Sequence, residues 1–548
     1  MSNDAQFKTH EVENQPRPLG AFNAWLSDRQ LREAVERNGG IWAEKHLSDF
    51  GQVVGHELMD SGELANRNKP VFHPYDRYGR RIDDVEFHPA YHHLMSKAME
   101  AQVHSFSWNH QDQVGAHVVR AALLYMHSQA DAGTGCPLTM THAVVPALLH
   151  SPEISKEWVS RITSGRYDPR TVPATQKGGV TIGMGMTEKQ GGSDVRRNTT
   201  RAIAQADGSY RIIGHKFFFS APFCDAHLIL AQAEGGLSCF LLPRVLEDGS
   251  LNEVRIQRLK DKLGDWSNAS SEVEFQGAVA YLVGAEGRGV PVIIDMVSLT
   301  RLDCMIGSTG MMKQALTQVL NHTSQRSAFG RVLIDQPLMR NVLADLALEC
   351  EASIALTMRV ARAVDASSRD SHEAAFARIA TAIGKYWICK RAPGFINEAQ
   401  ECLGGIGYVE ENILPRLYRQ APLNSIWEGS GNVQCLDVLR ALQKEPEVRN
   451  ALFVELQRSL GKNPIYDKHI GWLQAAFQDI STLEVRSRLV VERAALALQA
   501  SLLLTAGDDQ IADAFCHARL GQEQGLVYGT LDPSAPFDLL IERAKPVV

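Results

Sequence analysis

The sequence has no hydrophobic run long enough to cross a membrane. Its most apolar stretch, residues 494–506, spans about a dozen residues and is interrupted by Gln499 and Ser501. A membrane-spanning helix needs about 20 consecutive apolar residues. Residues 1–20 are polar and lack the apolar core of a signal peptide. These absences exclude a membrane protein and a secreted protein, and they predict a soluble chain.

Closely spaced cysteine pairs and an excess of positive charge are also missing. The nine cysteines are scattered, so we expect reduced thiols and a cytoplasmic location. Cys224 with His227, and His88 with His92, lack further ligands at a standard spacing, and we expect no metal site. The 56 Lys and Arg residues face 63 Asp and Glu residues, which gives a net charge of −7. No global positive field therefore attracts nucleic acid.

The pattern of apolar residues predicts a multi-domain chain that combines α and β regions. Residues 1–179 show helical spacing and a polar arm, with a polar loop near residues 66–84, and predict an N-terminal all-α domain. Residues 180–286 consist of short apolar segments between Asp-Gly and Gly-Gly hairpin signals, which predicts a β domain. Residues 287–444 return to helical spacing and predict a bundle, and residues 445–548 predict an additional C-terminal helical domain.

Residues 186–194 carry the most specific local signal, Met-Thr-Glu-Lys-Gln-Gly-Gly-Ser-Asp. The two adjacent glycines let the backbone adopt positive φ and approach a flat ligand closely, while Thr187 and Ser193 offer hydrogen bonds. Such a loop suits a ring with polar edges or a phosphate. Taken alone, the same residues are also typical of a plain turn. Because no G-x-G-x-x-G stands between a strand and a helix, a Rossmann dinucleotide site is not supported.

The α–β–α order, with this loop entering the β domain, resembles the acyl-CoA dehydrogenase superfamily of flavoproteins. Residues 186–194 match the first signature of that superfamily. Residues 401–408, Glu-Cys-Leu-Gly-Gly-Ile-Gly-Tyr followed by Arg416, match the second. Two departures stand out: Gln420 replaces the usual acidic residue or Asn, and Trp266 replaces a common Arg. The resemblance implies an N-terminal α domain, a middle β-barrel or sandwich and a C-terminal helical bundle.

The sequence is more similar still to one branch, the AidB-like proteins of the adaptive response to DNA alkylation. The matching segments run almost the whole length of the chain and weaken after about Lys444. They include residues 64–68, 75–76, 79–85, 183–186, 214–216 and 424–432. The branch is associated with DNA binding through its extra C-terminal helical domain. A conventional acyl-CoA dehydrogenase without DNA binding is the alternative.

The resemblance implies that the chain binds FAD. It places Thr187 near the pyrimidine edge of the flavin, Phe218 and Phe219 over its face, and Ser220 as a donor at N5. An aromatic ring stacks on the isoalloxazine, and a donor at N5 stabilises the reduced ring. The implied cofactor-binding residues are Met184, Gly185, Met186, Thr187, Ser193, Phe218, Phe219, Ser220, Arg326, Phe329, Gln336, Gly404, Gly405, Ile426, Trp427, Gly429, Ser430 and Asn432.

Part of this set implies an oligomer. Arg326, Phe329 and Gln336 match a motif that holds the FAD pyrophosphate of a neighbouring subunit, and residues 404–407 would pass close to the same cofactor. Each FAD site would then span two subunits, and we expect a homotetramer. Each segment also has a structural explanation: residues 217–219 are typical of a buried strand, an Arg with Phe-Gly of a surface helix end, and the glycines of a helix C-cap.

Glu428 is the residue that the resemblance implies as catalytic. In the dehydrogenases of the superfamily, a glutamate at this point removes the proton α to a thioester carbonyl. Such a base needs a raised pKa, which an apolar Ile426 and the ring of Trp427 provide by desolvating the carboxylate. Nitroalkane oxidases, a sister branch, use Asp in this role, so Glu favours the dehydrogenase chemistry. A Glu before Gly-Ser-Gly is also typical of a helix cap.

A DNA-binding role has weaker support in the charge pattern. Residues 445–548 contain 10 Lys and Arg against 14 Asp and Glu, a net charge of −4, so duplex DNA would need positive residues gathered on one face. Arg440 matches a position tied to DNA contact in the branch. Arg440 could form a DNA-binding patch with Lys444, Arg486, Arg488 and Arg493. The alternative is that these residues form a solvated helix face. In a second group, Arg77, Arg80 and Arg81 precede Asp83 and Asp84, which predicts internal ion pairs.

Overall fold

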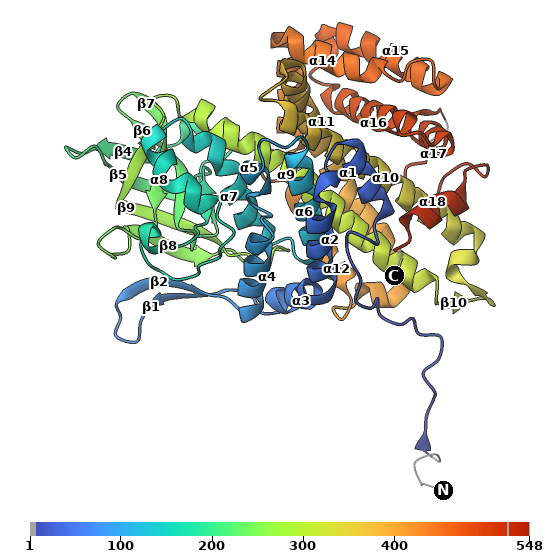
Figure 1. Cartoon of the computed structure of the whole chain (residues 1–548), viewed down its shortest axis with the longest axis horizontal. Coiled ribbons are helices and arrows are strands. Elements are labelled where there is room, and N and C mark those ends of the chain that lie inside the picture. The colour runs from blue at the N-terminus through green and yellow to red at the C-terminus, as the bar shows by residue number, and fades with distance from the viewer. Residues whose placement is uncertain (1–6, 523–524, 547–548) are drawn as a thin grey trace.

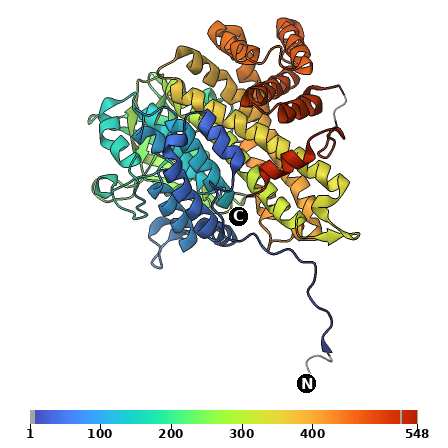
Figure 2. The ribbon, with the colours of Figure 1, turned by 45° about the vertical axis from the view of Figure 1, so that its right-hand side comes forward.

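The computed structural model describes residues 7–522 and 525–546 of the chain. In Figure 1 the β domain lies at one end, long helices fill the centre, and the C-terminal helices form a layer above them. Figure 2 shows residues 446–515 standing apart from the N-terminal helices, with the long central helices between them, while the last helix, residues 537–544, packs against the first one, residues 29–37. The α–β–α order predicted for the chain is present, followed by the additional helical domain.

The N-terminal region is mostly helical but contains one β-hairpin. Its helices are α1 (Arg29–Arg37), α2 (Glu44–Val53), α3 (Met59–Arg67), α4 (Pro89–Glu100), α5 (Phe106–Asn109), α6 (Ala116–Ala130), α7 (Gly135–Leu148) and α8 (Pro152–Ile162). Strand β1 (Val71–Tyr75) pairs antiparallel with β2 (Arg81–Glu86). The expected polar loop is therefore a hairpin, and the prediction of an all-α domain was wrong on this point. Its apolar residues are sparse, and only Val85 among them is buried, which gave a weak strand signal.

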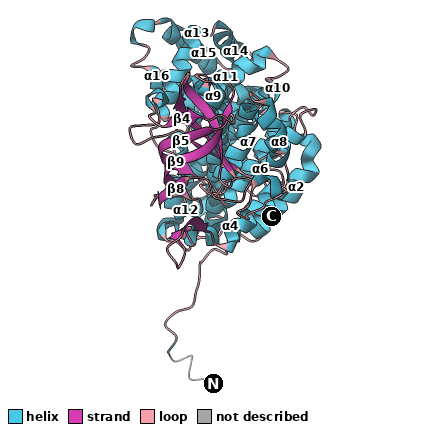
Figure 3. Ribbon diagram, turned by 90° about the vertical axis from the view of Figure 1, so that its left-hand side faces the viewer, coloured by secondary structure: helices cyan, strands magenta, loops and turns pink. Residues whose placement is uncertain are grey.

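The β domain is a sheet that closes on itself. Its strands are β3 (Ile182–Gly185), β4 (Arg201–Ala204), β5 (Tyr210–Ser220), β6 (Ala226–Ala233), β7 (Gly236–Pro243), β8 (Val254–Leu259) and β9 (Ser270–Val283). The order β6–β4–β5–β9–β7 returns to β6 through the β6–β7 pair, while β3 and β8 add to β6 and β9. Figure 3 shows this sheet in front of the helices. The closure leaves β5 with one face toward the interior of the domain and one face outward.

Long helices form the centre of the molecule. They are α9 (Gly289–Thr323), α10 (Pro337–Ala366), α11 (Ser371–Leu403), α12 (Ile413–Gln420) and α13 (Gly431–Lys444). A short hairpin, β10 (Ser327–Ala328) with β11 (Arg331–Val332), joins α9 to α10. One hydrophobic core runs from the N-terminal helices through this bundle into the C-terminal domain, and a second joins α7 to the β domain. The bundle is thus the scaffold against which the other regions pack.

The C-terminal domain consists of α14 (Pro446–Gln457), α15 (Pro464–Gln478), α16 (Ser487–Ala506), α17 (Asp509–Phe515) and α18 (Phe537–Ala544). Helix α16 is long and apolar enough to cross a membrane, but 67% of its apolar window is buried. It packs on α10, α11 and α13, so its composition is that of a core helix. All nine cysteines of the chain are free and buried, in agreement with the expected reduced thiols.

Candidate active site

The Gly-Gly loop at residues 186–194 lies against the middle of β5. The carbonyl of Thr187 accepts a hydrogen bond from the Phe217 backbone N–H at 2.8 Å, and Asn198 Nδ2 donates to the Met186 carbonyl at 2.9 Å. Gly191 has a φ of +143°, and a Cβ built there would meet nothing within 4 Å. The loop is thus fixed at its start, and Gly191 borders open space, whereas a Cβ at Gly192 would meet Oγ1 of Thr187 at 2.4 Å. Ser193 lies in the same exposed part.

A buried ion pair that the sequence analysis did not find anchors this loop. The Nζ of Lys216, on β5, donates to Glu188 Oε1 at 2.9 Å, and both side chains have 0% exposure. The backbone N–H groups of Thr199 and Thr200 donate to the same carboxylate at 2.7 and 3.2 Å. Burial alone would raise the pKa of Glu188, but Lys216 and these hydrogen bonds lower it to about 2. The carboxylate therefore ties the loop to β5 and to the residues directly before β4.

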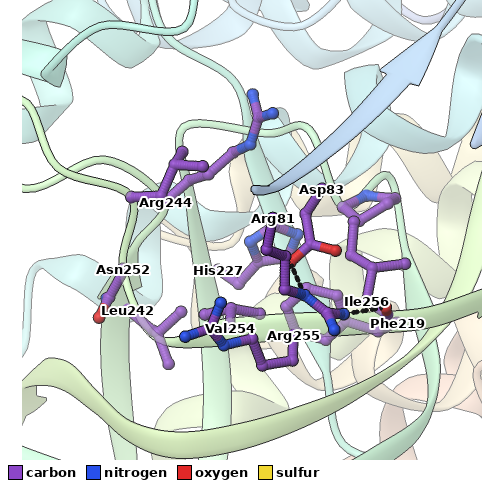
Figure 4. Close-up of a pocket in the computed structure, with 12 residues that line it drawn as sticks. Arg81, Asp83, Phe219, His227, Leu242, Arg244, Asn252, Val254, Arg255 and Ile256 are labelled. Carbon is purple, nitrogen blue, oxygen red and sulfur yellow. Dashed lines mark hydrogen bonds and ion pairs between the residues drawn. The ribbon is translucent and has the colours of Figure 1, made fainter. Parts of the chain in front are cut away.

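Phe218 and Phe219 point to opposite sides of β5. Phe218 is 52% exposed, whereas Phe219 is 1% exposed and stacks on His227 with ring centroids 4.0 Å apart. Figure 4 shows Phe219 and His227 together at a pocket of about 200 Å³ that also includes Arg81 and Arg244. Because side chains alternate along a strand, Ser220 shares the outer face with Phe218. The Phe219 ring is therefore not on the face that Phe218 presents, and the assignment of Phe219 to the flavin stays a prediction.

Two further predicted residues lie inside the β domain. Met184 is 8% exposed and packs in the core that joins α7 to the sheet. A Cβ at Gly185 would meet Cδ2 of Phe219 at 2.5 Å, so this position requires glycine because an aromatic ring fills the space. The Met184 side chain therefore faces the core, and its contact with a cofactor stays a prediction. The loop that follows is the part that reaches the surface.

Arg326, Phe329 and Gln336 come together at the hairpin between α9 and α10. The side-chain amide of Gln336 donates to the Ala328 carbonyl at 2.8 Å and braces the turn. Phe329, at the tip, has a left-handed φ of +51° and is 99% exposed. An aromatic side chain this exposed has no partner within its own chain that removes it from water. The hairpin thus presents an apolar tip beside an arginine.

The glycines at residues 404–407 form a second exposed surface. Gly404 has a φ of +65°, and a Cβ built at Gly404 or Gly405 would meet nothing within 4 Å. Nearby, Ile406 and Tyr408 are exposed, the latter at 82%. This backbone is open to close approach by another molecule. The sequence explanation as a simple C-cap accounts for Gly404 but not for the exposed apolar residues after it.

Lys385 on α11, which the sequence analysis missed, holds the segment around Glu428. Its side chain is 1% exposed, and its Nζ donates to three backbone carbonyls, those of Asn424, Trp427 and Gly429, at 3.0, 2.9 and 2.9 Å. Glu428, between the last two, has a left-handed φ of +57°, a conformation that costs free energy for a non-glycine residue. The three bonds compensate for that cost and fix the direction of the Glu428 side chain.

The Glu428 carboxylate lies in a site that shields it from water. Desolvation by burial raises its pKa above the ordinary 4.5, while a hydrogen bond from Thr300 and the charges of Lys385 and Arg301 limit the rise. Thr300 Oγ1 donates to Glu428 Oε2 at 2.7 Å. Arg301 Nε and Gln434 Nε2 donate to the Glu428 backbone carbonyl, each at 3.1 Å. The group is therefore a positioned carboxylate whose basicity exceeds that of an exposed glutamate.

The other predicted residues of this segment surround Glu428. Ile426, Ser430 and Asn432 are exposed, and Ser430 precedes α13. Trp427 packs against the core shared by α7, α9 and the β domain, and Met186, at the start of the Gly-Gly loop, packs against the same core. The loop and the Glu428 segment thus border the same hydrophobic cluster. The described residues contain no group of three or more His, Cys, Asp or Glu side chains able to hold a metal ion.

Trp266 and Gln420, the two departures from the superfamily pattern, lie close together in the structure. Trp266 contacts Arg419, the residue before Gln420, and Gln420 bonds to Asp265, the residue before Trp266. The ring of Trp266 lies between two cations, with Lys69 Nζ at 4.0 Å and Arg419 Cζ at 4.1 Å from its centroid. Gln420 accepts a hydrogen bond from the Asp265 backbone N–H at 2.6 Å. Trp266 therefore joins the N-terminal region, the β domain and α12 by cation–π contacts. The unusual residues act as one structural unit.

We expect Trp266→Arg to destabilise the protein by about 2 kcal/mol, because it removes two cation–π contacts and places a third positive charge between Lys69 and Arg419. Trp266→Phe keeps a ring and should cost less than half as much. Thermal or denaturant unfolding of the two variants measures the difference. Equal stability of Trp266→Arg and the natural protein would show that the stacked cations contribute nothing.

The positive residues considered for DNA binding fall into two classes. Arg440 is exposed on α13, and Arg488 and Lys390 both act electrostatically on Cys435 of that helix. Arg486, by contrast, pairs with Asp479 at 3.0 Å. In the hairpin, Arg81 pairs with Asp83 at 2.8 Å, as expected for an internal ion pair. Arg440 and Arg488 thus leave positive charge near α13. The hairpin also keeps positive charge, because Arg77 and Arg80 lie over the ring of Tyr78, at 4.8 and 5.6 Å from its centroid, and the expected ion pair is found for Arg81.

Comparison with known families identifies three domains in this order. The Adaptive response protein AidB N-terminal domain matches residues 14–169, the acyl-CoA dehydrogenase middle domain matches residues 183–278, and the acyl-CoA dehydrogenase C-terminal domain matches residues 287–443. The chain is 48% identical to AidB of Escherichia coli (strain K12) over 546 residues, which is 99% of each chain. It is 31% identical to acyl-CoA dehydrogenase family member 11 of Caenorhabditis elegans, over 86% of this chain and 78% of that protein.

Solved structures agree with these matches. The Caenorhabditis elegans ACDH-11 structure in complex with C11-CoA superposes with a TM-score of 0.85 at 26% identity and covers 94% of both chains. Butyryl-CoA dehydrogenase from Megasphaera elsdenii shares the fold, with a TM-score of 0.57 at 20% identity over 76% of this chain and 98% of that one. Members of this oxidoreductase family are FAD-dependent flavoproteins, which confirms the predicted cofactor and fold. The chain belongs to the acyl-CoA dehydrogenase family, in its AidB branch.

Proposed function

We propose that this protein is a cytoplasmic, homotetrameric FAD enzyme that oxidises an acyl thioester with Glu428 as its catalytic base. The observation that carries the proposal is the partly buried Glu428 carboxylate, held by Thr300 at 2.7 Å in a segment that Lys385 fixes. A structural cap would need neither a partly desolvated carboxylate with a raised pKa nor a buried lysine behind it. The arrangement suits a base that must stay in one place and remain ionised near neutral pH.

The residues around the Gly-Gly loop fit a flavin. The outward ring of Phe218 and the hydroxyl of Ser220 lie on one face of β5, with Thr187 hydrogen-bonded to the same strand. Gly191, Gly404 and Gly405 border open space in which added side chains would meet nothing, so a flat ligand has room against the backbone. We assign Phe218 to the flavin face, Ser220 and Thr187 to its polar edge, and Ser193 to the loop that encloses it.

The length of α9 supports a cofactor site shared between two subunits. Thr300, which contacts Glu428, and Thr323, three residues before Arg326, lie in one continuous helix. Their separation is about 35 Å at 1.5 Å per residue, more than one extended FAD molecule spans. Arg326 and Glu428 of one chain therefore serve different cofactors. The exposed Phe329 and Tyr408 are then surfaces that a neighbouring subunit covers in the tetramer.

The chemistry follows from the position of the base. The Glu428 carboxylate takes the proton from the carbon next to the thioester carbonyl, and FAD, when bound, supplies the hydride-accepting group. Desolvation by burial keeps the pKa of the carboxylate above that of an exposed glutamate. Thr300 donates to one oxygen of the carboxylate, Oε2, and we assign the proton transfer to the other oxygen.

The test is an anaerobic titration of the FAD-bound protein with saturated acyl-CoA thioesters of short, medium and long chain. Loss of the oxidised flavin absorbance is expected with at least one of them, and the complex of a 26%-identical relative with C11-CoA makes medium chains the first choice. A thioether analogue without the carbonyl lacks an acidic α proton and serves as the control. Flavin that stays oxidised with every thioester would reject the proposal.

A second proposal is that the protein also binds duplex DNA through the positive residues of α13, as part of protection against alkylation. It rests on the exposed Arg440, with Arg488 and Lys390 near the same helix, and on the 48% identity to AidB. Because residues 445–548 carry a net charge of −4, only a local patch is available for phosphate contacts.

We expect Arg440→Ala to weaken duplex binding and to reduce the slope of log affinity against log salt by about one. Fluorescence anisotropy with a labelled duplex at several salt concentrations measures both quantities. Gln443→Ala, on the same exposed part of α13, is the matched control and should leave the slope unchanged. If the natural protein shows no binding at low salt, this proposal fails; an unchanged slope in Arg440→Ala removes Arg440 from the interface.

A further inference from the structure

The N-terminal arm contacts the hairpin that carries Arg326. In Figures 1 and 2 the arm leaves the body of the molecule and runs past the end that bears β10. Leu19 packs against the main core, and residues before it continue as extended chain along the end of α9. The arm thus connects the first helices to a site that lies more than 300 residues later in the sequence.

Asn14 makes a reciprocal pair of hydrogen bonds with the backbone of Ser327. Its Nδ2 donates to the Ser327 carbonyl at 2.8 Å, and its Oδ1 accepts from the Ser327 N–H at 2.8 Å. The backbone carbonyl of Asn14 accepts from Arg326 Nη1 at 2.6 Å. Asn14 has a left-handed φ of +53°, which asparagine tolerates better than most residues. One arm residue therefore holds both the guanidinium and the following peptide of the arginine segment.

Arg17 extends this contact to the end of α9. Its backbone N–H donates to Gln325 Oε1 at 3.0 Å, and its carbonyl accepts from Asn321 Nδ2 at 3.0 Å. The Gln325 amide also donates to the Asn321 carbonyl at 3.0 Å. The arm is thus joined to residues on both sides of the arginine backbone. These bonds involve specific side chains rather than general apolar packing, which indicates a defined position for the arm.

We infer that Asn14 is a positioning residue for Arg326 in the flavin site of the neighbouring subunit. This inference rests on the proposed shared site. A guanidinium has five N–H donors, and the bond to the Asn14 carbonyl occupies one of them while fixing the plane of the group. The remaining donors are available to a phosphate. An arginine held in place beforehand loses less conformational freedom when the cofactor binds.

The experiment measures FAD affinity of the full-length tetramer in a double-mutant cycle. Asn14→Ala should weaken FAD binding about tenfold, Arg326→Ala should weaken it more, and the double variant should be no weaker than Arg326→Ala alone. Asn14→Gly keeps the left-handed backbone but loses the side chain, and it should match Asn14→Ala. Gln15→Ala, one residue along the arm, is the control and should bind FAD normally. Thermal unfolding of the FAD-free proteins should be the same for all.

The outcomes distinguish a failure of the positioning role of Asn14 from a failure of the shared flavin site. If Asn14→Ala and Arg326→Ala act independently, so that their effects multiply, the arm does not work through the arginine and the inference is overturned. Tighter FAD binding by Asn14→Ala would overturn it as well, since it would mean that the arm competes with phosphate for Arg326. If Arg326→Ala itself leaves FAD affinity unchanged, the shared site fails, and the role of Asn14 fails with it.

Discussion

A Glu428→Gln protein is expected to keep its fold and its FAD but to lose thioester-dependent flavin reduction by roughly three orders of magnitude. The amide is nearly isosteric with the carboxylate and still accepts the bond from Thr300, which is 2.7 Å long in the natural protein. It cannot take a proton from the substrate. Stopped-flow absorbance after anaerobic mixing gives the rate. Glu411→Gln, an exposed glutamate of the same bundle, is the control and should react normally.

The pH dependence of the same reaction provides a second readout. The base works only when ionised, so the rate should fall with decreasing pH below the pKa of Glu428, which burial raises above 4.5. Thr300→Val removes the bond that favours the ionised form, so its pKa should rise further and the acid limb should move to higher pH. At alkaline pH this variant should approach the natural rate. An unshifted limb, or normal turnover by Glu428→Gln, would assign the proton transfer to another group.

Lys216→Met is expected to reduce the free energy of unfolding by about 3–5 kcal/mol, because it leaves the Glu188 carboxylate buried without its positive partner. Both side chains of the natural pair have 0% exposure and lie 2.9 Å apart. Denaturant unfolding of the FAD-free protein measures the loss. The double variant Lys216→Met with Glu188→Gln removes the unpaired charge and should recover much of the stability. A loss below about 1 kcal/mol in the single variant would contradict this account.

The ion pair also predicts how stability depends on pH. The folded pKa of Glu188 is lowered to about 2 from an ordinary 4.5. Its contribution is therefore complete above pH 4.5 and is lost as the pH falls from 4.5 toward 2. In Lys216→Met the loss of stability between pH 4.5 and 2 should be smaller, because without Lys216 the pKa of Glu188 in the folded protein no longer lies so far below its pKa in the unfolded chain.

Lys216→Met should also bind FAD more weakly, because Glu188 anchors the Gly-Gly loop.

The elements that sequence reasoning predicted correctly depend on local patterns. The segments expected as strands became β5, β6 and β7, because short apolar runs between Gly-containing turns have few alternatives. The helical spacing after the β domain likewise gave the long bundle. The hairpin of β1 and β2 was missed since its apolar residues are sparse and partly exposed. The hairpin forms because its two strands pair with each other, and the pattern of apolar residues does not show this pairing.

The candidate site shows the same division between local and distant information. The Gly-Gly loop, Ser220, Arg326 and Glu428 were selected from motifs, and the alternation along β5 already separates Phe218 from Phe219. Lys385 could not be selected, because a lone lysine in a helix is ordinarily exposed and its three acceptors are backbone carbonyls about 40 residues away. Asn14 lies 313 residues from Ser327, a distance over which no spacing rule applies.

The sequence by itself determined the order of the domains, the family, the cofactor and the residue types that carry chemistry, since each is written in contiguous segments. The tertiary structure decided which of those residues are fixed by other side chains, and which side chains fix them. Lys385 behind Glu428, Lys216 under the Gly-Gly loop, and Asn14 beside Arg326 each join segments that are far apart in the chain. Burial raises the free energy of a charge, and a nearby opposite charge or hydrogen bond lowers it. Both effects arise only after the surrounding elements have packed, so these relations exist in the folded protein alone.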